Sequence, residues 1–291
     1  MKIGIDIRTL MDARYSGVSE YTFNLVREIL KLDTVNEYQL FYNSFRNLRG
    51  ITRNLTLKNA EVIQWRWPNK ILNYFLFKLF NWPKVDEKLD ADVFFMPHIN
   101  FIGLSKNSSV KKILTVHDLS FLRYPEFFSW RKNFWHKMID VKKLVKKFDV
   151  IVAVSENTKR DIVELCGVEP EKVNVIYSGV GNEYCQIASD DIGGQQKIEE
   201  VKRKYNLPDK FILFLGTLEP RKNIEGLIEA YNELRSTRPS VRPAGCVLCD
   251  YKLVIAGGKG WKGKNIYEVW KKSPFKDDII FTGYVDREDK P

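Results

Sequence analysis

The sequence predicts an α/β protein with two doubly wound domains, in which parallel strands alternate with helices. Short β-rich runs, several of them apolar throughout, alternate with segments of helical periodicity. The alternation breaks in a polar stretch around residues 188–196, after which a second strand–helix series begins. We therefore expect an N-terminal domain over 1–185, a linker over 186–200 and a C-terminal domain over 201–291.

The first series carries the expected strands and two clear helices. Its strands are KIGIDI, YQLFYN, EVIQW, DVFFM, KKILTVH and DVIVAVS. Residues 19–32 place Leu25, Val26, Ile29 and Leu30 on one helical face. Ser155 is a suitable N-cap for a helix over 156–166.

The second series is shorter than the first. It consists of KFILFLG, a helix that ends at about Arg235, YKLVIAG, a helix around 265–272, and DIIFTG. A doubly wound domain generally needs more than three strands to complete its core, so we expect this domain to be incomplete. An incomplete sheet should expose apolar surface.

Composition limits the classes of protein that the chain can be. With 291 residues and 44% hydrophobic content it can bury substantial cores. Asp6 and Arg8 interrupt any signal-peptide core, and no apolar run reaches the roughly 20 residues that span a bilayer, so we expect a cytoplasmic protein. Cys246 and Cys249 form a single CxxC without a second pair, which indicates ordinary reduced thiols. The net charge of +10 suits phosphorylated ligands, a membrane surface or nucleic acid.

The stretch FILFLGTLEPRKNIEGLIEAY, residues 211–231, indicates a phosphate site. An apolar strand ends in Gly216, and Arg221 and Lys222 stand where a helix begins. Helix N-termini already attract anions, so two further cations there indicate a strongly anionic ligand such as a phosphate or diphosphate. The alternative is that both are solvated surface charges.

A set of segments in a fixed order resembles a known family. They are YSGVSEYTFNL, TVHDLSFLRYPEFF, VIVAVSENTKRDI, VNVIYSGV, FILFLGTLEPRKN, LVIAGGKGW and IIFTGYV, and they cover nearly the whole chain. In this order they resemble the retaining glycosyltransferases of family 4, which have the GT-B fold of two Rossmann-like domains. The resemblance implies transfer of a sugar, of mannose or glucose type, from a nucleotide-activated donor to a glycan or lipid-linked acceptor in surface polysaccharide synthesis.

The resemblance also assigns roles to residues of this chain. As catalytic residues it implies His117, Arg221 and Lys222. As donor-binding residues it implies Gly17, Asp118, Gly216, Thr217, Glu219, Arg221 and Lys222. Many relatives have an arginine where this chain has Thr217, so Arg221 would take over that role. Gly17 also fits a plain turn, and His117 with Asp118 also fits a structural pair at a strand end.

No metal ion or cofactor is expected, because fixed cations can balance the charge that develops on the leaving phosphate. Gly258, Gly260 and Gly263 match the GxGxxG pattern of dinucleotide-binding enzymes. The pattern lies inside the second series, and we do not expect a dehydrogenase from it. The expected partner is a nucleotide-sugar, which is a substrate.

Two segments are candidates for bringing the protein to its acceptor. Residues 69–82 show a broad apolar helical face flanked by tryptophans, and residues 130–147 combine apolar positions with many cations. Such segments are typical of peripheral binding at an anionic membrane, here the inner face, but they equally fit core-facing helices with a solvated back. No nucleic-acid-binding motif accompanies the charge, so no nucleic-acid partner is expected.

The end of the chain gives one more expectation. Relatives carry two glutamates eight positions apart beyond the phosphate site. After Lys222, the glutamates Glu225, Glu229 and Glu233 are spaced by four along the expected helix, where they fit its solvated face and do not match that pair. We therefore expect a C-terminally truncated enzyme that is inactive or nearly so by itself. The alternative is a non-catalytic fragment, or half of a split enzyme, that binds a nucleotide, a membrane or a partner.

Overall fold

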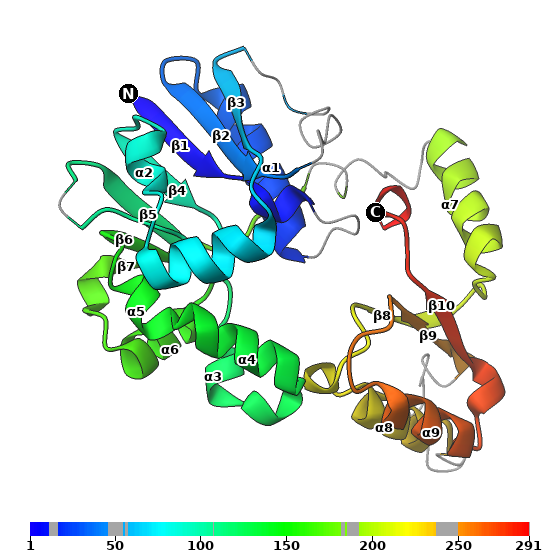
Figure 1. Ribbon diagram of the computed structural model, residues 1–291. Helices are drawn as coiled ribbons and strands as arrows, with labels where there is room; N and C mark the ends of the chain where they lie inside the picture. The colour runs from blue at the N-terminus through cyan, green and yellow to red at the C-terminus, as the bar shows by residue number, and fades with distance from the viewer. Residues whose placement is uncertain are drawn as a thin grey trace. The chain divides into compact units, whose positions relative to one another are not determined.

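The computed structural model describes residues 1–11, 17–45, 55, 58–106, 108–181, 184, 192–236 and 250–290. The chain divides into two compact units (Figure 1). The first unit consists of Met1–Pro125 and Trp130–Gly179, and the second of Glu126–Ser129 and Val180–Pro291.

The expected linker 186–200 differs from what the structure has. Its first part, 186–191, lies outside the described residues, as do Cys246 and Cys249. From Ile192 onward the chain is helical and forms α7 (Ile192–Tyr205). The glycines at 193 and 194 therefore lie within a helix, whose remaining residues are mostly good helix formers such as glutamine, lysine and glutamate.

Within the described residues, the first unit is built on a seven-stranded sheet. Its strands are β1 (Lys2–Asp6), β2 (Glu37–Asn43), β3 (Ala60–Trp65), β4 (Val93–Met96), β5 (Lys111–Val116), β6 (Val150–Ala153) and β7 (Val173–Val175). They lie in the order β3-β2-β1-β4-β5-β6-β7, and all neighbours are parallel. The predicted doubly wound parallel sheet is confirmed. Its connections reverse direction between β1 and β4, which is the point where such sheets bind ligands.

Helices connect these strands. They are η1 (Arg8–Met11), α1 (Gly17–Leu32), η2 (Ile71–Phe80), α2 (Val85–Lys88), α3 (Ser120–Arg123), η3 (Pro125–Phe127), α4 (Trp130–Ile139), α5 (Val141–Val145), α6 (Glu156–Cys166) and η4 (Pro170–Lys172). The predicted cap is confirmed, because the Ser155 side chain accepts a hydrogen bond from the backbone N–H of Thr158 at 3.1 Å. At the other end of α6, Gly167 adopts the left-handed conformation that ends helices.

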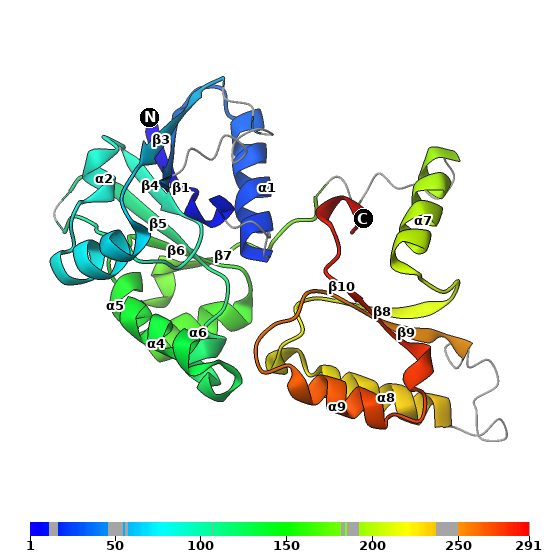
Figure 2. The same cartoon turned by 45° about the vertical axis from the view of Figure 1, so that its right-hand side comes forward.

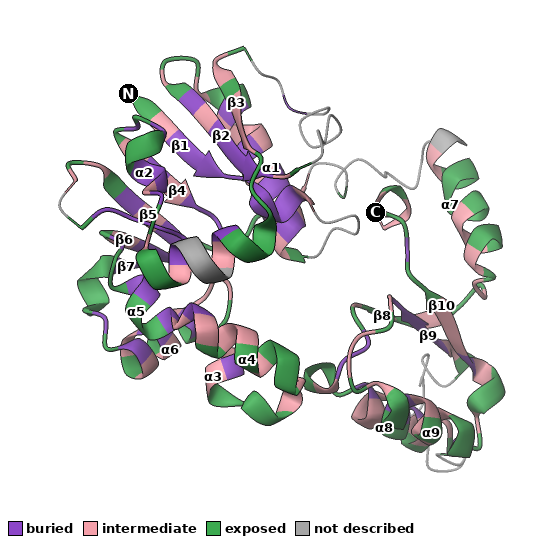
Figure 3. Ribbon diagram, viewed as in Figure 1, coloured by how far each residue is buried: buried purple, intermediate pink, exposed green. Residues whose placement is uncertain are grey.

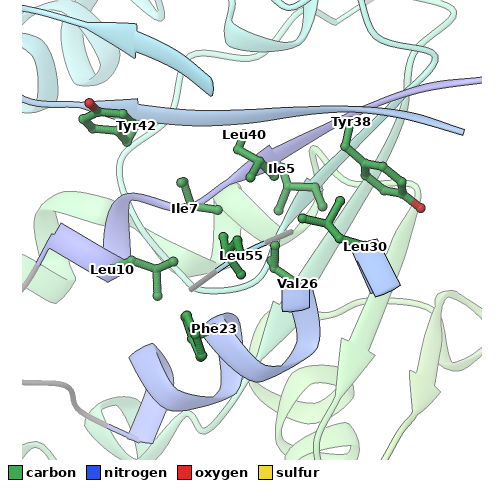
Figure 4. Packing of buried hydrophobic residues seen from close by; sticks show 10 residues of the cluster. All are labelled: Ile5, Ile7, Leu10, Phe23, Val26, Leu30, Tyr38, Leu40, Tyr42 and Leu55. Carbon is green, nitrogen blue, oxygen red and sulfur yellow. The ribbon is translucent and has the colours of Figure 1, made fainter. Parts of the chain in front are cut away.

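The predicted apolar face of α1 covers the sheet in part, because Val26 and Leu30 are buried while Leu25 is only half-buried. Figure 4 shows Phe23, Val26 and Leu30 from this helix against Ile5 and Leu40 of β1 and β2. All five side chains are buried. Burying side chains of this size stabilises a fold by roughly 1.5–3 kcal/mol each, which fixes α1 over the carboxyl half of the sheet.

The two segments predicted as amphipathic helices are both irregular. Residues Ile71–Phe80 wind as a π-helix. The segment 130–147 is not one helix: it breaks at Asp140, whose φ of 55° is left-handed, into α4 and α5. The break lets Ile139 and Val141, which flank Asp140, both be buried.

The second unit has a smaller sheet. In the described part, β8 (Phe211–Leu215), β9 (Lys252–Ala256) and β10 (Ile279–Gly283) pair in parallel in the order β10-β9-β8. Its helices are α7, η6 (Pro220–Lys222), α8 (Ile224–Ser236), α9 (Lys264–Lys272), η8 (Lys276–Asp278) and η9 (Arg287–Asp289). Figures 1 and 2 show α8 and α9 side by side along one face of this sheet, with α7 on the other side.

The two faces of the small sheet are covered unequally. On the side of α8 and α9, Ile224, Ile228 and Leu253 are almost fully buried. On the side of α7 lies an apolar groove of about 200 Å³, where Leu213 and Leu215 stay 53% and 46% exposed. Most of α7 is exposed or half-buried (Figure 3). Exposed apolar surface is therefore present on the α7 side of this sheet.

Candidate functional site

The carboxyl end of β8 leads into the predicted phosphate loop. The chain passes from Leu215 through Gly216 and Thr217 into the turn η6, and α8 begins directly after Asn223. Asn223 has a left-handed φ of 48°, and its side-chain oxygen accepts a hydrogen bond from Gly226 N at 3.3 Å. Arg221 and Lys222 thus stand in the last turn before a thirteen-residue helix, close to its free N–H groups.

Arg221 is held in place by Glu219. The Arg221 Nε donates to Glu219 Oε1, and Glu219 itself is only 2% exposed. The guanidinium also lies over the ring of Phe128, 6.0 Å from its centre. Through this hydrogen bond, Glu219 orients the guanidinium group of Arg221.

Lys222 has a different environment. Its residue is exposed, and in the part of the chain that the structure describes no side chain pairs with its ammonium group. Glu219 already offsets the charge of Arg221, so Lys222 contributes the uncompensated positive charge of this loop. That charge and the N-terminus of α8 together suit an anion.

The glycine-rich loop after β9 packs against the phosphate loop. Leu218 N donates to Gly258 O, and Gly260 N donates to Leu218 O, both at 3.0 Å. A Cβ on Gly257 would lie 1.8 Å from Gly216 O, and one on Gly260 would lie 2.5 Å from Leu218 O. Gly257, which directly precedes the GxGxxG pattern, and Gly260, which belongs to it, therefore allow two backbone loops to approach each other.

Four residues from between α3 and α4 belong to the second unit and border this loop. Phe128 stacks on Trp261 with ring centres 5.8 Å apart. The indole Nε1 of Trp261 donates to Phe127 O at 2.7 Å, and Lys262 Nζ donates to Glu126 O at the same distance. This contact was not predicted from the sequence, because its two segments lie about 130 residues apart along the chain.

The other predicted site residues lie at the carboxyl edge of the first sheet. Gly17 is exposed at the start of α1, and one helical turn later the Tyr21 ring meets the His117 ring edge-on, 4.7 Å away. His117 follows β5 directly. Asp118 accepts hydrogen bonds from the backbone N–H and the hydroxyl of Ser120, at 3.0 and 2.6 Å, and so closes the turn before α3.

The protonation of His117 follows from its partner. Its Nε2 lies 3.0 Å from the carbonyl oxygen of Pro97, which can only accept, so Nε2 carries a proton. Burial lowers the pKa of His117, which keeps the ring neutral. Its Nδ1 is then a hydrogen-bond acceptor, suited to a hydroxyl group.

A buried polar cluster beside His117 was not predicted from the sequence. Asp6 and Arg8 form a buried ion pair with Arg8 Nη2 to Asp6 Oδ2 at 2.6 Å. Burial by itself would raise the pKa of Asp6, but the charge and hydrogen bonds of Arg8 outweigh it and hold the pKa below its usual value. His98, which is 7% exposed, lies within reach of both charges. The signal that could have revealed this cluster was charge at the carboxyl end of the first strand, where Asp6 is the last strand residue and Arg8 follows two positions later.

Comparison with known proteins decides the family. The sequence profile described as Glycosyltransferase Family 4 matches residues 15–183, more than half of the chain. The chain belongs to glycosyltransferase family 4. A second profile, Glycosyl transferases group 1, matches residues 195–291 and includes the phosphate loop.

The relatives of this family 4 chain include two mannosyltransferases of Escherichia coli. The serotype-specific mannosyltransferase WbdA of Escherichia coli is 34% identical over 179 residues, 62% of this chain and 21% of WbdA. The O-antigen chain mannosyltransferase B of Escherichia coli is 25% identical over 187 residues, 62% of this chain and 44% of that protein. The chain thus spans less than half of the length of these curated relatives.

Solved structures show the fold of this family 4 chain, which is GT-B. Anabaena Alr3699/HepE in complex with UDP and glucose has a TM-score of 0.59 at 14% identity, over 98% of this chain and 70% of that one. WaaG, a glycosyltransferase involved in lipopolysaccharide biosynthesis, has a TM-score of 0.55 at 12% identity, over 99% of this chain and 71% of that one. The predicted GT-B architecture is confirmed.

Proposed function

We propose that this protein transfers a sugar, mannose or glucose, from a nucleotide-activated donor to a glycan or lipid-linked acceptor with retention at the anomeric carbon. The observation that carries the proposal is the loop after β8, where Arg221 and Lys222 precede the N-terminus of α8 in the segment matched by the group 1 profile. Named relatives that are mannosyltransferases, two of them of O-antigen or serotype specificity, favour surface polysaccharide synthesis.

The chemistry follows from the charges. The bond between the anomeric carbon and the diphosphate oxygen breaks, an acceptor hydroxyl oxygen takes its place, and the hydroxyl proton leaves to the departing phosphate. Negative charge grows on that phosphate, and fixed cations stabilise it most in the transition state. Lys222 supplies the mobile cation and Arg221 the oriented one, so we propose a transfer that needs no metal ion.

A screen of nucleotide-sugars by calorimetry tests this function. We expect one nucleoside-diphosphate sugar to bind and the free nucleoside diphosphate to compete with it, because the loop recognises the phosphates. Incubation with a lipid-linked or oligosaccharide acceptor then measures transfer. Binding without transfer would favour a non-catalytic module, and no binding of any nucleotide-sugar would contradict the proposal.

We further propose that the acceptor is presented at an anionic membrane surface, on an apolar and basic surface around Asn81. Its exposed apolar members are Ile71, Leu79, Phe80 and Trp82, and its cations are Lys78, Lys84, Lys106 and Lys147. Burial lowers the pKa of Lys147, and the positive charges of the other three lysines lower it further. The four cations therefore lie close together. None of the described helices is long and apolar enough to cross a bilayer. Surface attachment is therefore the mode we propose.

Vesicle flotation is expected to show attachment at low salt that weakens at high salt, because ions screen the lysines. The double variant Lys78→Glu/Leu79→Ser should lower the bound fraction several-fold, since each cation near an anionic surface contributes about 1 kcal/mol. Lys31→Glu/Leu32→Ser is the matched control, an adjacent exposed pair at the end of α1. An equal loss of vesicle binding in the two variants, or no binding at low salt, would contradict the proposed membrane-binding role of this surface.

A further inference from the structure

Two buried nitrogen atoms at the carboxyl edge of the first sheet lack a hydrogen-bond partner. They are Arg8 Nη1 and His98 Nδ1. Arg8 is 6% exposed and His98 is 7% exposed. An unpaired buried donor costs about 1–3 kcal/mol, so a pair of them in one place needs an explanation.

The hydrogen bonds around His98 show that its free atom is a donor. Asn100 Oδ1 accepts from the backbone N–H of Phe101 at 2.8 Å, which fixes the orientation of the amide. Asn100 Nδ2, which can only donate, then faces His98 Nε2 at 3.4 Å. Burial lowers the pKa of His98 to about 4, so the ring is neutral and its proton sits on Nδ1. Both unpaired atoms are therefore N–H donors.

The Arg8 guanidinium is rigidly held. Its Nε and Nη2 donate to both oxygens of Asp6, and Nη2 also donates to Phe101 O at 2.9 Å. The rings of Phe41 and Phe77 lie 5.5 and 5.6 Å from its central carbon. The remaining nitrogen, Nη1, is thus fixed in direction before any ligand arrives.

The two donors flank the ligand-binding point of the sheet. Arg8 follows β1 and His98 follows β4, the adjacent strands between which the connections reverse direction. Both side chains contact the dipeptide 100–101, Arg8 through the backbone carbonyl of Phe101 and His98 through the side-chain amide of Asn100, so the two lie close together. His98 also follows Pro97, whose carbonyl accepts from His117. The pair therefore adjoins His117, one of the residues that the family resemblance implies to be catalytic.

Charge limits the ligand group that can bind. Asp6 neutralises Arg8, and neutral His98 adds no charge. A phosphate would bring an uncompensated negative charge into a buried place, which is costly, whereas hydroxyl or carbonyl oxygens would satisfy the donors without one. We propose that Arg8 and His98 form a carbohydrate subsite whose two N–H groups donate to neutral oxygens of a sugar, a hydroxyl or an acetamido carbonyl. This inference rests on the proposed function.

Histidine-ring NMR tests the subsite directly. The chain holds three histidines, which makes the ¹H–¹⁵N ring spectrum simple to assign. We titrate it with the methyl glycosides of mannose, glucose and N-acetylglucosamine. At least one glycoside, or a nucleotide-sugar, is expected to shift the His98 Nδ1–H signal. A shift by glycosides alone assigns the oxygen to the acceptor, and a shift by the nucleotide-sugar alone assigns it to the transferred sugar.

Two variants separate a subsite from a structural role. His98→Phe removes the donor and should weaken saccharide binding by about 3–10-fold, the range of one hydrogen bond between neutral groups. His98→Asn, whose amide nitrogen stands where Nδ1 does, should retain most of the affinity. Nucleoside diphosphate binding should be unchanged in both variants, because Lys222 and Arg221 belong to the other unit.

The outcomes distinguish the two proposals. If neither the glycosides nor the nucleotide-sugar shifts the His98 signal, or if His98→Phe binds as tightly as the wild type, the donors serve only a bound water and the subsite is wrong. If saccharides bind at His98 but no nucleotide-sugar binds the protein, the proposed sugar transfer fails while the subsite stands. If His98→Phe fails to fold, the titration of the wild type and the affinity of His98→Asn still decide whether saccharides bind at His98.

Discussion

Replacing Lys222 with alanine is expected to weaken nucleoside diphosphate binding by about 1.5–3 kcal/mol, the contribution of a hydrogen bond to a charged group. In a full-length relative, the same change should lower the rate of sugar transfer by about 10²-fold or more, because the leaving phosphate carries its greatest charge in the transition state. Calorimetry measures the first effect and initial rates of transfer measure the second. Lys222 is a cleaner probe than Arg221, whose removal would also leave the buried carboxylate of Glu219 unpaired.

Two further variants check this prediction. Lys222→Arg keeps the positive charge and should retain much of the binding. Lys210→Ala removes an exposed lysine just before β8, at the opposite edge of the same sheet, and should change neither quantity. Unchanged nucleotide binding in Lys222→Ala, or an equal loss in Lys210→Ala, would show that the loop after β8 does not hold the phosphates.

Gly257→Ala is expected to destabilise the second unit by at least about 3 kcal/mol. Gly257 has a φ of 147°, which L-residues rarely adopt, and a Cβ there would lie 1.8 Å from Gly216 O. Its N–H donates to Gly283 O at 2.7 Å, so a shift of this residue would separate the ends of β9 and β10. Thermal unfolding followed by circular dichroism, together with nucleotide binding, measures the effect.

The neighbouring glycine provides the control. A Cβ on Gly258 would meet only the Tyr284 ring, at an ordinary contact distance of 3.7 Å. Gly258→Ala should therefore leave the melting temperature and nucleotide binding nearly unchanged. Equal tolerance of alanine at both positions would mean that the close approach of the two loops is not required.

Much of the fold follows from local sequence patterns. Apolar runs marked the strands of both sheets, since a strand covered on both faces has few polar positions. The cations Arg221 and Lys222 were found because positive charge is unusual at a helix start and because the strand ends in Gly216. Where local pattern was ambiguous, prediction failed: the segment 130–147 reads as one helix but breaks at Asp140.

The sequence by itself determined the alternation of strands and helices, the family, and the loop that carries the cations expected to bind phosphate, because each depends on residues close together in the chain. Only the tertiary structure decided which groups these residues meet. Glu219 binds Arg221, the four residues 126–129 join the second unit, and glycines of a dinucleotide-like pattern allow two loops to touch. It also brought Arg8 and His98, about 90 residues apart, to one edge of the sheet with unpaired donors. Such contacts depend on strand order and on hydrogen bonds across the sheet edge, which no local pattern encodes.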